Sequence, residues 1–367
     1  MLAIEEMNLK EVVNCSGKMT YLGSSTLSDS VIEAMNYAAK HYFDMDDLNR
    51  KIGNYIGEKA NAGGGCVTAG ASAGVIIAVA AVITQGNKQW VEFVPNVPTT
   101  KKKILLQKGH SISFGASLNQ MVQLGGGEIL EVGQVNKCLD YHLENNIDQD
   151  TAAILYVQSH HAVSDGMLSL PEVITIAKQH NIPVIVDAAA EEDIKKYISL
   201  GASLVIYSGA KAFSGPTSGC IVGEKQLIDW CFLQFKGVAR PMKVGKENLV
   251  GLLEAIYFST QSEGIKEKQY ALLKPLEDYL ITIPGIKCSY HEDQVGRNIV
   301  RLRVKVENPF PYNALDFSAK LKGGRIAVYT RDHHAEQGYI EFDPRPMQEQ
   351  DIKLVIQSIE ELMENTK

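Results

Sequence analysis

The chain has 367 residues, of which 45% are hydrophobic, enough to bury the core of one large domain and a smaller companion. Its formal net charge of -7 provides no general attraction to polyphosphate backbones, so we expect no nucleic-acid partner. The six cysteines form no CxxC pair and no metal-ligand spacing, which predicts reduced thiols, no metal site and a cytoplasmic protein.

The N-terminal segment carries acidic residues where a secretory signal would be basic, so we expect no signal peptide. The most apolar run, residues 69–83, is interrupted by glycine and serine. At about 15 residues it is shorter than the roughly 20 that a membrane span requires. We therefore predict a buried helix in this run and no membrane partner.

From about Thr68 to Val222, apolar β-branched runs alternate with amphipathic segments, which is typical of βα units around a mainly parallel sheet. The clearest strands and helices in this region are strands 151–157, 182–187 and 202–208 and helices 170–179 and 191–198. After Gly245 a long helical stretch follows, with an interruption expected at Gly264. Short strands (298–306, 325–330, 338–343) and a closing amphipathic helix from residue 349 then predict a small α+β domain.

These elements predict an α/β protein with three parts. An N-terminal segment covers residues 1–45, a large domain covers 46–250, and a linker helix with the small C-terminal domain covers 251–367. The sequence contains no internal repeat and no low-complexity tract, so we expect little disorder.

Two residues at the predicted sheet edge match what a protein supplies to pyridoxal phosphate. Asp187 ends the strand 182–187, and Lys211 follows the strand 202–208 in the glycine-rich stretch SGAKAFSGPTSG. Side chains beyond the carboxyl ends of neighbouring strands converge on one crevice. A helix N-cap and a surface lysine are the ordinary alternatives, but both residues in one crevice favour a cofactor site. We predict that Lys211 holds pyridoxal phosphate as a Schiff base and acts as the base, while Asp187 keeps the pyridine nitrogen protonated.

A phosphate cradle is predicted where small residues lead into the apolar helix. Small side chains expose backbone N–H groups at a helix N-terminus, which attracts anions, although a tightly packed Ala/Gly helix would look the same. We expect Ser208 to add a hydroxyl and the His110 ring to stack on the cofactor. Among the polar residues 158–161 we choose Ser159 as a cofactor contact. The cradle residues are Gly70, Ala71, Ser72, Ala73 and Gly74.

These residues resemble those of fold-type I pyridoxal-phosphate enzymes, and within them the selenocysteine-synthase-like group. The similar segments are VVNCSGKMTYLGSSTLSDSVIEAM, SGAKAFSGPTSGCIVG and RPMKVGKENLVGLLEAI. The resemblance implies a large domain with a mainly parallel seven-stranded sheet, a small α+β C-terminal domain, and a homodimer or higher homo-oligomer. Because the shared opening begins near Val12, we expect the N-terminal tRNA-binding domain of selenocysteine synthase to be missing.

Within this group, the C-terminal stretch YTRDHHAEQGYIEFDPRP resembles enzymes of sugar-acid catabolism. That resemblance implies release of ammonia from 2-amino-2-deoxy-D-gluconate 6-phosphate to form 2-dehydro-3-deoxy-D-gluconate 6-phosphate. Three alternatives stay open. They are another reaction on the same scaffold (an aminotransferase, a sulfur amino acid lyase or an aldolase), a transferase acting on aminoacyl-tRNA, and a non-catalytic binding protein.

A sugar-acid phosphate carries a carboxylate and a phosphate, and basic side chains are suited to both. We assign Arg331 and Arg345 to the carboxylate. A solvated charged loop is an equally good interpretation of each such residue. In this group the N-terminal segment covers the pocket, so Tyr42 and Arg50 are expected to act across a subunit interface. The candidates for the phosphate are Arg240, Lys243 and Lys246.

Overall fold

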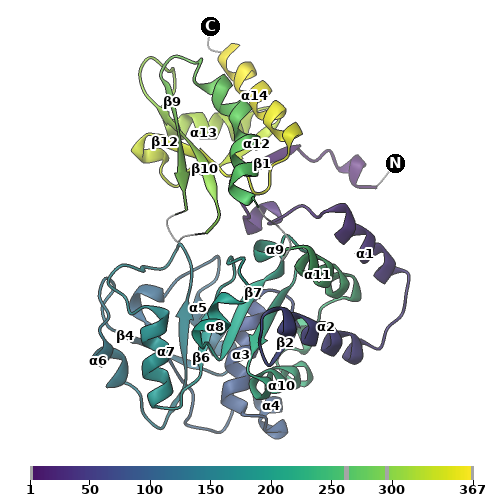
Figure 1. Cartoon of the computed structure of the whole chain (residues 1–367), viewed down its shortest axis with the longest axis vertical. Coiled ribbons are helices and arrows are strands. Elements are labelled where there is room, and N and C mark those ends of the chain that lie inside the picture. Colours follow the sequence, from purple (N-terminus) through teal and green to yellow (C-terminus); the bar gives the residue numbers. More distant parts are fainter. Residues whose placement is uncertain (1–2, 260–263, 294–296, 365–367) are drawn as a thin grey trace. The chain divides into compact units, whose positions relative to one another are not determined.

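The computed structural model describes residues 3–259, 264–293 and 297–364, and it divides into two compact units. Unit 1 combines Met1–Thr26 with Gln261–Lys367, and unit 2 is Leu27–Thr260 (Figure 1). This division differs from the expected parts 1–45, 46–250 and 251–367. The reason is that β1 (Val12–Cys15) pairs in parallel with β11 (Ala327–Thr330), which joins the N-terminal segment to the C-terminal unit.

Unit 2 is built on a seven-stranded sheet in the order β2-β8-β7-β6-β5-β3-β4. Neighbours from β7 to β4 are parallel, and β8 is antiparallel to both β7 and β2. The predicted mainly parallel, seven-stranded sheet is therefore confirmed. The strands are β2 (Gly64–Thr68), β3 (Lys103–Gln107), β4 (Glu128–Val132), β5 (Thr151–Val157), β6 (Val184–Asp187), β7 (Leu204–Ser208) and β8 (Gly219–Gly223).

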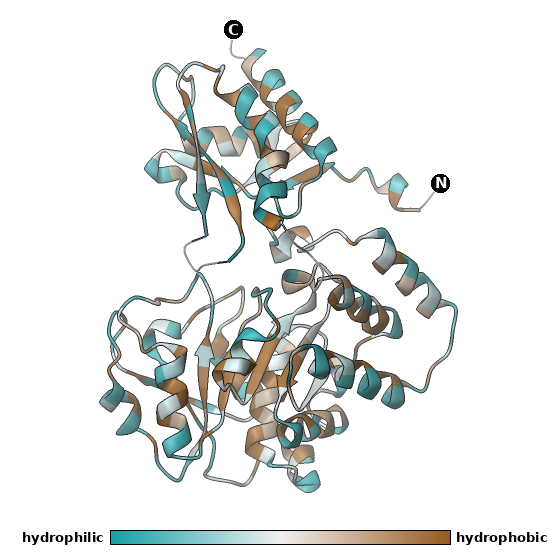
Figure 2. Ribbon diagram, in the orientation of Figure 1, coloured by the Kyte–Doolittle hydropathy of each residue, from teal (hydrophilic) through white to brown (hydrophobic). Residues whose placement is uncertain are grey.

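Helices cover both faces of this sheet, which explains why its central strands are apolar without polar alternation. Val205 and Ile206 are neighbours on β7 but belong to different core clusters, one on each face. Figure 2 shows these central strands in brown. The helices are α1 (Asp29–Ala39), α2 (Met45–Lys59), α3 (Ala71–Thr84), α4 (Lys88–Phe93), α5 (Leu118–Leu124), α6 (Asp140–Glu144), α7 (Leu170–Gln179), α8 (Lys196–Leu200), α9 (Gly209–Ala212), α10 (Lys225–Leu233) and α11 (Lys246–Ser259).

In two of the predicted helices of unit 2, hydrogen bonds with nearby side chains determine where the helix begins. Helix α7 has the predicted bounds, because Ser169 and Glu172 form a capping box at its N-terminus. The predicted helix 191–198 is wrong in its first part. The Asp193 carboxylate accepts hydrogen bonds from the N–H groups of Lys195 and Lys196, so α8 begins only at residue 196.

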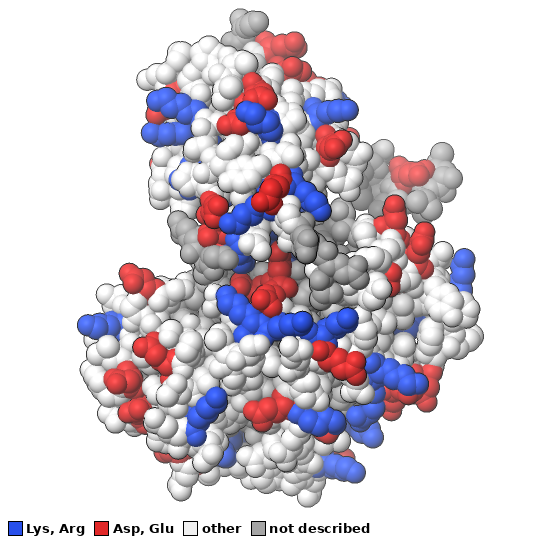
Figure 3. All heavy atoms as spheres, viewed as in Figure 1, with Lys and Arg blue, Asp and Glu red and all other residues white. Residues whose placement is uncertain are grey.

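Helix α3 is buried over Ala73–Thr84, as predicted for the most apolar run. No helix in the described part of the chain is long and apolar enough to cross a membrane. All six cysteines are free thiols, and five of them are buried. Figure 3 shows acidic and basic side chains distributed together over the face in view.

Unit 1 has a parallel pair, β1 and β11, and a three-stranded antiparallel sheet in the order β12-β10-β9. Its core includes Val13 and Cys15 of β1, so the N-terminal strand is part of this unit's interior. Gly264, the expected interruption, has φ +66° and precedes α12, whereas residues 260–263 lie outside the described ranges. The remaining elements are α12 (Ile265–Leu280), β9 (Ile286–Glu292), β10 (Val300–Val306), α13 (Ala314–Gly323), β12 (Tyr339–Phe342) and α14 (Glu349–Glu364).

Candidate active site

Asp187 lies at the carboxyl end of β6, between Val157 of β5 and Ile206 of β7. Only 8% of its surface is exposed, and this burial raises the pKa of its carboxyl group to about 6. A hydrogen bond from the N–H of Ala189 (3.2 Å) and the nearby charge of Lys211 offset part of the rise. Asp187 takes part in none of the ion pairs of the described residues. A buried carboxylate of this kind is suited to a cationic partner.

Lys211 lies on α9, which starts directly after β7. The Ser208 hydroxyl caps this turn by accepting a hydrogen bond from the N–H of Lys211 (3.3 Å). Burial lowers the pKa of the Lys211 amine, and the charge of Asp187 opposes this shift. The turn is packed so closely that a Cβ on Gly209 would lie 2.2 Å from Ser218 Oγ. An amine held in this way is more often neutral, as a nucleophile or a base must be.

The N-terminus of α3 lies at the same sheet edge. Gly219 of β8 pairs with Thr68 of β2 on one side and with Ser208 of β7 on the other. A Cβ on Gly219 would lie 2.7 Å from the carbonyl carbon of Gly70, so only glycine allows β8 to approach this turn. A Cβ on Gly70 itself would meet no atom within 4 Å. The first N–H groups of a helix have no intrahelical partner, and the space beside Gly70 at this N-terminus is open.

The His110 ring, which we expected to stack on the cofactor, is buried in the structure. It is only 1% exposed, its Nδ1 accepts a hydrogen bond from the N–H of Val157 (3.3 Å), and Tyr156 contacts it edge-on with the ring centroids 4.6 Å apart. Burial lowers the pKa of the His110 imidazole to about 4, so the ring is neutral at physiological pH. Stacking on a cofactor would require this ring to be uncovered. Ser159 follows β5 at the same edge and accepts a hydrogen bond from the N–H of His161 (3.2 Å).

These features fit pyridoxal phosphate, because a carboxylate without an ion-pair partner, a desolvated amine and an open helix N-terminus lie at one edge of the sheet. Asp187 suits the pyridine nitrogen, Lys211 the aldehyde, and the first turn of α3 the phosphate. Sheet and site together define a pyridoxal-phosphate enzyme of fold type I. The described residues contain no group of three His, Cys, Asp or Glu side chains that could hold a metal ion.

Comparison with known proteins agrees with this class. The family model of L-seryl-tRNA selenium transferase (SelA) matches residues 12–282. D-glucosaminate-6-phosphate ammonia lyase from Salmonella typhimurium is 40% identical over 98% of both chains. A 5'-C-glycyluridine monooxygenase-decarboxylase from Streptomyces sp is 38% identical over 98% of this chain and 91% of the relative. A solved structure of D-glucosaminate-6-phosphate ammonia-lyase superposes with a TM-score of 0.93 at 39% identity, covering 100% of this chain and 99% of the other. The chain therefore belongs to the SelA family.

Several residues predicted to bind substrate have other partners in the structure. Lys246 donates hydrogen bonds to the carbonyl oxygens of Ala38 and Ala39 (3.0 Å to the latter) at the end of α1, and it pairs with Glu247 (2.9 Å). The Arg50 guanidinium lies over the Phe232 ring, 4.6 Å from its centroid, and 3.9 Å from Asp229. Within one chain, the Lys246 amine is therefore held at the end of α1, whereas the Arg50 side chain keeps 56% of its surface exposed. Three other residues in this set, Tyr42, Arg240 and Lys243, are exposed.

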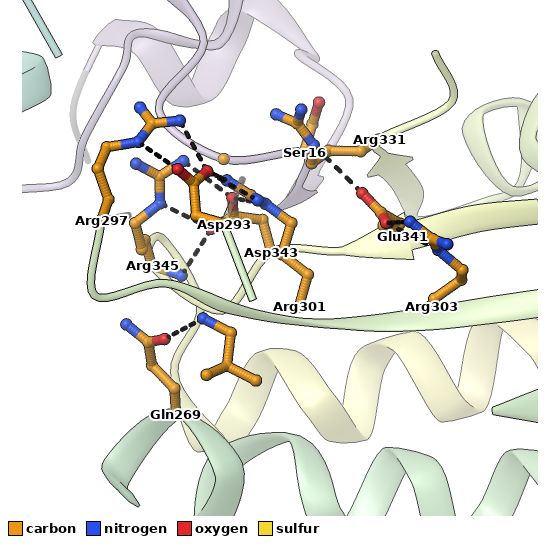
Figure 4. Close-up of polar contacts among 12 residues, drawn as sticks. Ser16, Gln269, Asp293, Arg297, Arg301, Arg303, Arg331, Glu341, Asp343 and Arg345 are labelled. Atoms are coloured by element: carbon orange, nitrogen blue, oxygen red, sulfur yellow. Dashed lines mark hydrogen bonds and ion pairs between the residues drawn. The ribbon is translucent and has the colours of Figure 1, made fainter. Parts of the chain in front are cut away.

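Arg331 and Arg345 lie in unit 1 within a cluster of charged side chains that the sequence predicted only in part (Figure 4). Asp343 pairs with Arg345 (2.9 Å) and with Arg301 (2.9 Å). Asp293 pairs with Arg301 (3.1 Å) and with Arg297. Among these additional residues, only Arg301 had a signal in the sequence, because two arginines within the apolar strand NIVRLRVKV are unusual for a buried strand.

Proposed function

We propose that this protein is a pyridoxal-phosphate-dependent ammonia-lyase that converts 2-amino-2-deoxy-D-gluconate 6-phosphate into 2-dehydro-3-deoxy-D-gluconate 6-phosphate and ammonia. The observation that carries this proposal is the 40% identity with the Salmonella ammonia lyase over 98% of both chains. The arrangement of Asp187 and Lys211 at the sheet edge provides the chemistry that such a reaction requires.

Pyridoxal phosphate, when bound, supplies an electron sink for the charge that develops when the substrate α-carbon loses its proton. Lys211 takes this proton, because burial lowers the pKa of its amine and so favours the neutral form that acts as a base. Asp187 holds a proton on the pyridine nitrogen, and its burial strengthens that interaction. The first turn of α3 binds the cofactor phosphate through backbone N–H groups. In the overall reaction the 3-hydroxyl leaves as water, and a second water replaces the amine with the keto oxygen.

The two anionic ends of the substrate require separate contacts. We propose Arg331 and Arg345 for the carboxylate and the exposed Arg240 and Lys243 for the phosphate, since the Lys246 amine is engaged with α1. Tyr42 is 100% exposed on the single chain. With Arg50 it is proposed to act on the site of a neighbouring subunit in a cytoplasmic homo-oligomer.

The test is an assay of ammonia and 2-keto acid release from the cofactor-loaded protein. Its substrates are phosphorylated and unphosphorylated 2-amino sugar acids, with the Lys211→Ala variant as the control. We expect equal amounts of both products from the 6-phosphate and none with the variant. Formation of a pyridoxamine cofactor would instead indicate an aminotransferase. Oxygen consumption with a glycyl nucleoside and no ammonia release from sugar acids would indicate the activity named for the Streptomyces relative.

A further inference from the structure

The loop that leads from β6 to α8 contains a buried carboxylate that the proposed chemistry does not use. Glu191 follows Asp187 on this loop, and only 6% of its surface is exposed. Its Oε2 accepts a hydrogen bond from the hydroxyl of Tyr197 on α8 (2.7 Å), and Tyr197 is 2% exposed. Glutamate is rarely buried unless it is hydrogen-bonded, because removing its charge from water is costly. The Tyr197–Glu191 pair therefore needs an explanation.

The hydrogen bond between these two side chains has a fixed direction. Burial raises the pKa of the Tyr197 hydroxyl, and the Glu191 carboxylate raises it further, so the hydroxyl keeps its proton and donates. Tyr197 packs in the same apolar core as Ala188 and Ile194 of the loop. In such surroundings a hydrogen bond is stronger than in water and fixes the positions of its two groups. The pair therefore anchors Glu191 to α8.

A second buried tyrosine holds the other end of the loop. Tyr207 of β7 has no exposed surface, and its hydroxyl donates a shared hydrogen bond to the carbonyl oxygens of Asp193 (3.1 Å) and Ile194 (3.3 Å). Helix α8 also packs against β7 (Figure 1). Asp193 and Ile194 are thereby fixed to the strand that precedes Lys211, while Glu191 holds the part of the loop nearer the end of β6.

A backbone turn connects Glu191 to the candidate active site. The N–H of Glu191 donates to the carbonyl oxygen of Ala188 (3.0 Å), which closes the turn. Inside the turn, Ala189 forms hydrogen bonds in two directions. Its N–H donates to Asp187 Oδ1 (3.2 Å), and its carbonyl oxygen accepts from the N–H of Ser208 (3.0 Å). A displacement of this turn would therefore move both contacts at once.

Ser208 extends this connection to the turn that carries the amine. Its hydroxyl accepts a hydrogen bond from the N–H of Lys211 (3.3 Å). Ala189 is therefore bonded both to the Asp187 carboxylate and to the residue that caps the Lys211 turn. All of these residues belong to unit 2. The relative position of the two groups assigned to the cofactor thus depends on where the backbone holds Ala189.

We propose that Glu191 and Tyr197 are positioning residues: their hydrogen bond fixes the turn at Ala189 and, through it, the two groups that hold the cofactor. Neither side chain needs to touch the cofactor for this role. Small displacements of reacting groups lower rates strongly, so a remote contact of this kind affects turnover. The inference rests on the proposed function for the roles of Asp187 and Lys211, but it does not depend on the identity of the substrate.

The experiment uses variants of the full-length, cofactor-loaded protein. Tyr197→Phe removes one hydroxyl and keeps the ring, Glu191→Leu removes the carboxylate, and a third variant combines both changes. Tyr290→Phe is the matched control, because it removes a tyrosine hydroxyl that donates to Glu277 Oε2 (3.1 Å) in unit 1. Three quantities are measured: hydrogen exchange of backbone N–H groups by mass spectrometry, affinity for pyridoxal phosphate, and kcat and KM with 2-amino-2-deoxy-D-gluconate 6-phosphate.

We expect Tyr197→Phe to act locally. Exchange in the segments 187–191 and 208–211 should become roughly 3- to 10-fold faster, the effect of losing one buried hydrogen bond, and cofactor affinity should weaken by a similar factor. Exchange in β5 should be unchanged. The value of kcat should fall by roughly 10-fold or more with little change in KM, and the control should match the unmodified protein. A lower Tm with unchanged exchange in both segments and unchanged cofactor affinity would show a core contact only and overturn the proposal.

The combined variant tests whether the two side chains act as one unit. If the Tyr197 hydroxyl acts through Glu191, then adding Tyr197→Phe to Glu191→Leu should change cofactor affinity by less than about 2-fold. Effects of the two changes that simply multiply would contradict the proposal, because each residue would then act independently.

Hydrogen exchange and cofactor affinity also separate this inference from the proposed activity, since neither measurement involves a substrate. If no amino sugar acid releases ammonia but both measurements follow the expected pattern, the positioning role stands and the proposed reaction fails. If ammonia is released and Tyr197→Phe behaves like the Tyr290→Phe control in all three measurements, the reaction stands and the positioning role is excluded.

Discussion

Replacing Asp187 by asparagine should stabilise the cofactor-free protein while destroying its function. Burial raises the pKa of the Asp187 carboxyl from 3.8 to about 6. A shift of about two pKa units corresponds to about 3 kcal/mol, which is the cost of keeping the charge in this position at pH 7. Asparagine removes the charge but retains an oxygen that can accept the hydrogen bond from Ala189. The variant should therefore gain up to about 3 kcal/mol of unfolding free energy.

The sign of the pH dependence follows from the direction of this shift. The folded protein binds a proton at Asp187 more tightly than the unfolded chain does, so the charge costs stability fully above pH 6 and less as the pH falls toward 4. The gain from Asp187→Asn should be largest at pH 7 and nearly absent at pH 4.

Urea unfolding of both cofactor-free proteins at the two pH values measures this gain, and cofactor affinity and turnover are measured in parallel. Binding of pyridoxal phosphate should weaken and turnover should be largely lost, since a neutral amide no longer favours the protonated pyridine nitrogen. Equal stability of the two proteins at pH 7, or a gain that does not depend on pH, would refute the reasoning from burial. Near-normal turnover of Asp187→Asn would refute the assignment of Asp187 to the cofactor.

Three further variants test other parts of the site. Lys211→Ala should abolish turnover, and borohydride should no longer attach the cofactor covalently to the chain, which mass spectrometry detects. Gly219→Ala should cost about 1–3 kcal/mol in urea unfolding and weaken cofactor binding, because its Cβ would lie 2.7 Å from Gly70. Gly323→Ala is the control, since its Cβ would meet no atom within 4 Å. Lys246→Met should lower Tm without raising KM, because the Lys246 amine bonds the end of α1; a raised KM with unchanged Tm would restore its assignment to the substrate.

Strand patterns and strand-end residues were the parts of the site that the sequence could predict. Strand β5 has the predicted bounds, and Asp187 and Lys211 lie at adjacent strand ends as expected. Such predictions succeed because they depend on local periodicity and on a general property of parallel sheets. The number of strands followed only from the family resemblance, and neither the order of the strands nor the antiparallel direction of β8 was predicted, because both depend on long-range pairing.

The partners of charged side chains could not be predicted in the same way. Lys246 reaches carbonyl oxygens that lie 207 and 208 residues away, and Arg50 lies over a ring on α10. Sequence reasoning treated Arg331 and Arg345 alike, although only Arg345 has a bidentate carboxylate partner within unit 1. The charge of a side chain is visible in the sequence, but the groups that neutralise it depend on long-range packing.

The pairing of β1 with β11 has a consequence for the order of assembly. Unit 2 is continuous in sequence, so it can fold as soon as its own residues have been synthesised. Val12 pairs with Ala327, and the register ends at Thr330. Because β1 is synthesised before β11, it must wait for its partner until Thr330 has been made. Until then β1 is an unpaired strand edge with apolar Val13, and we expect its protection to depend on how quickly β11 is synthesised.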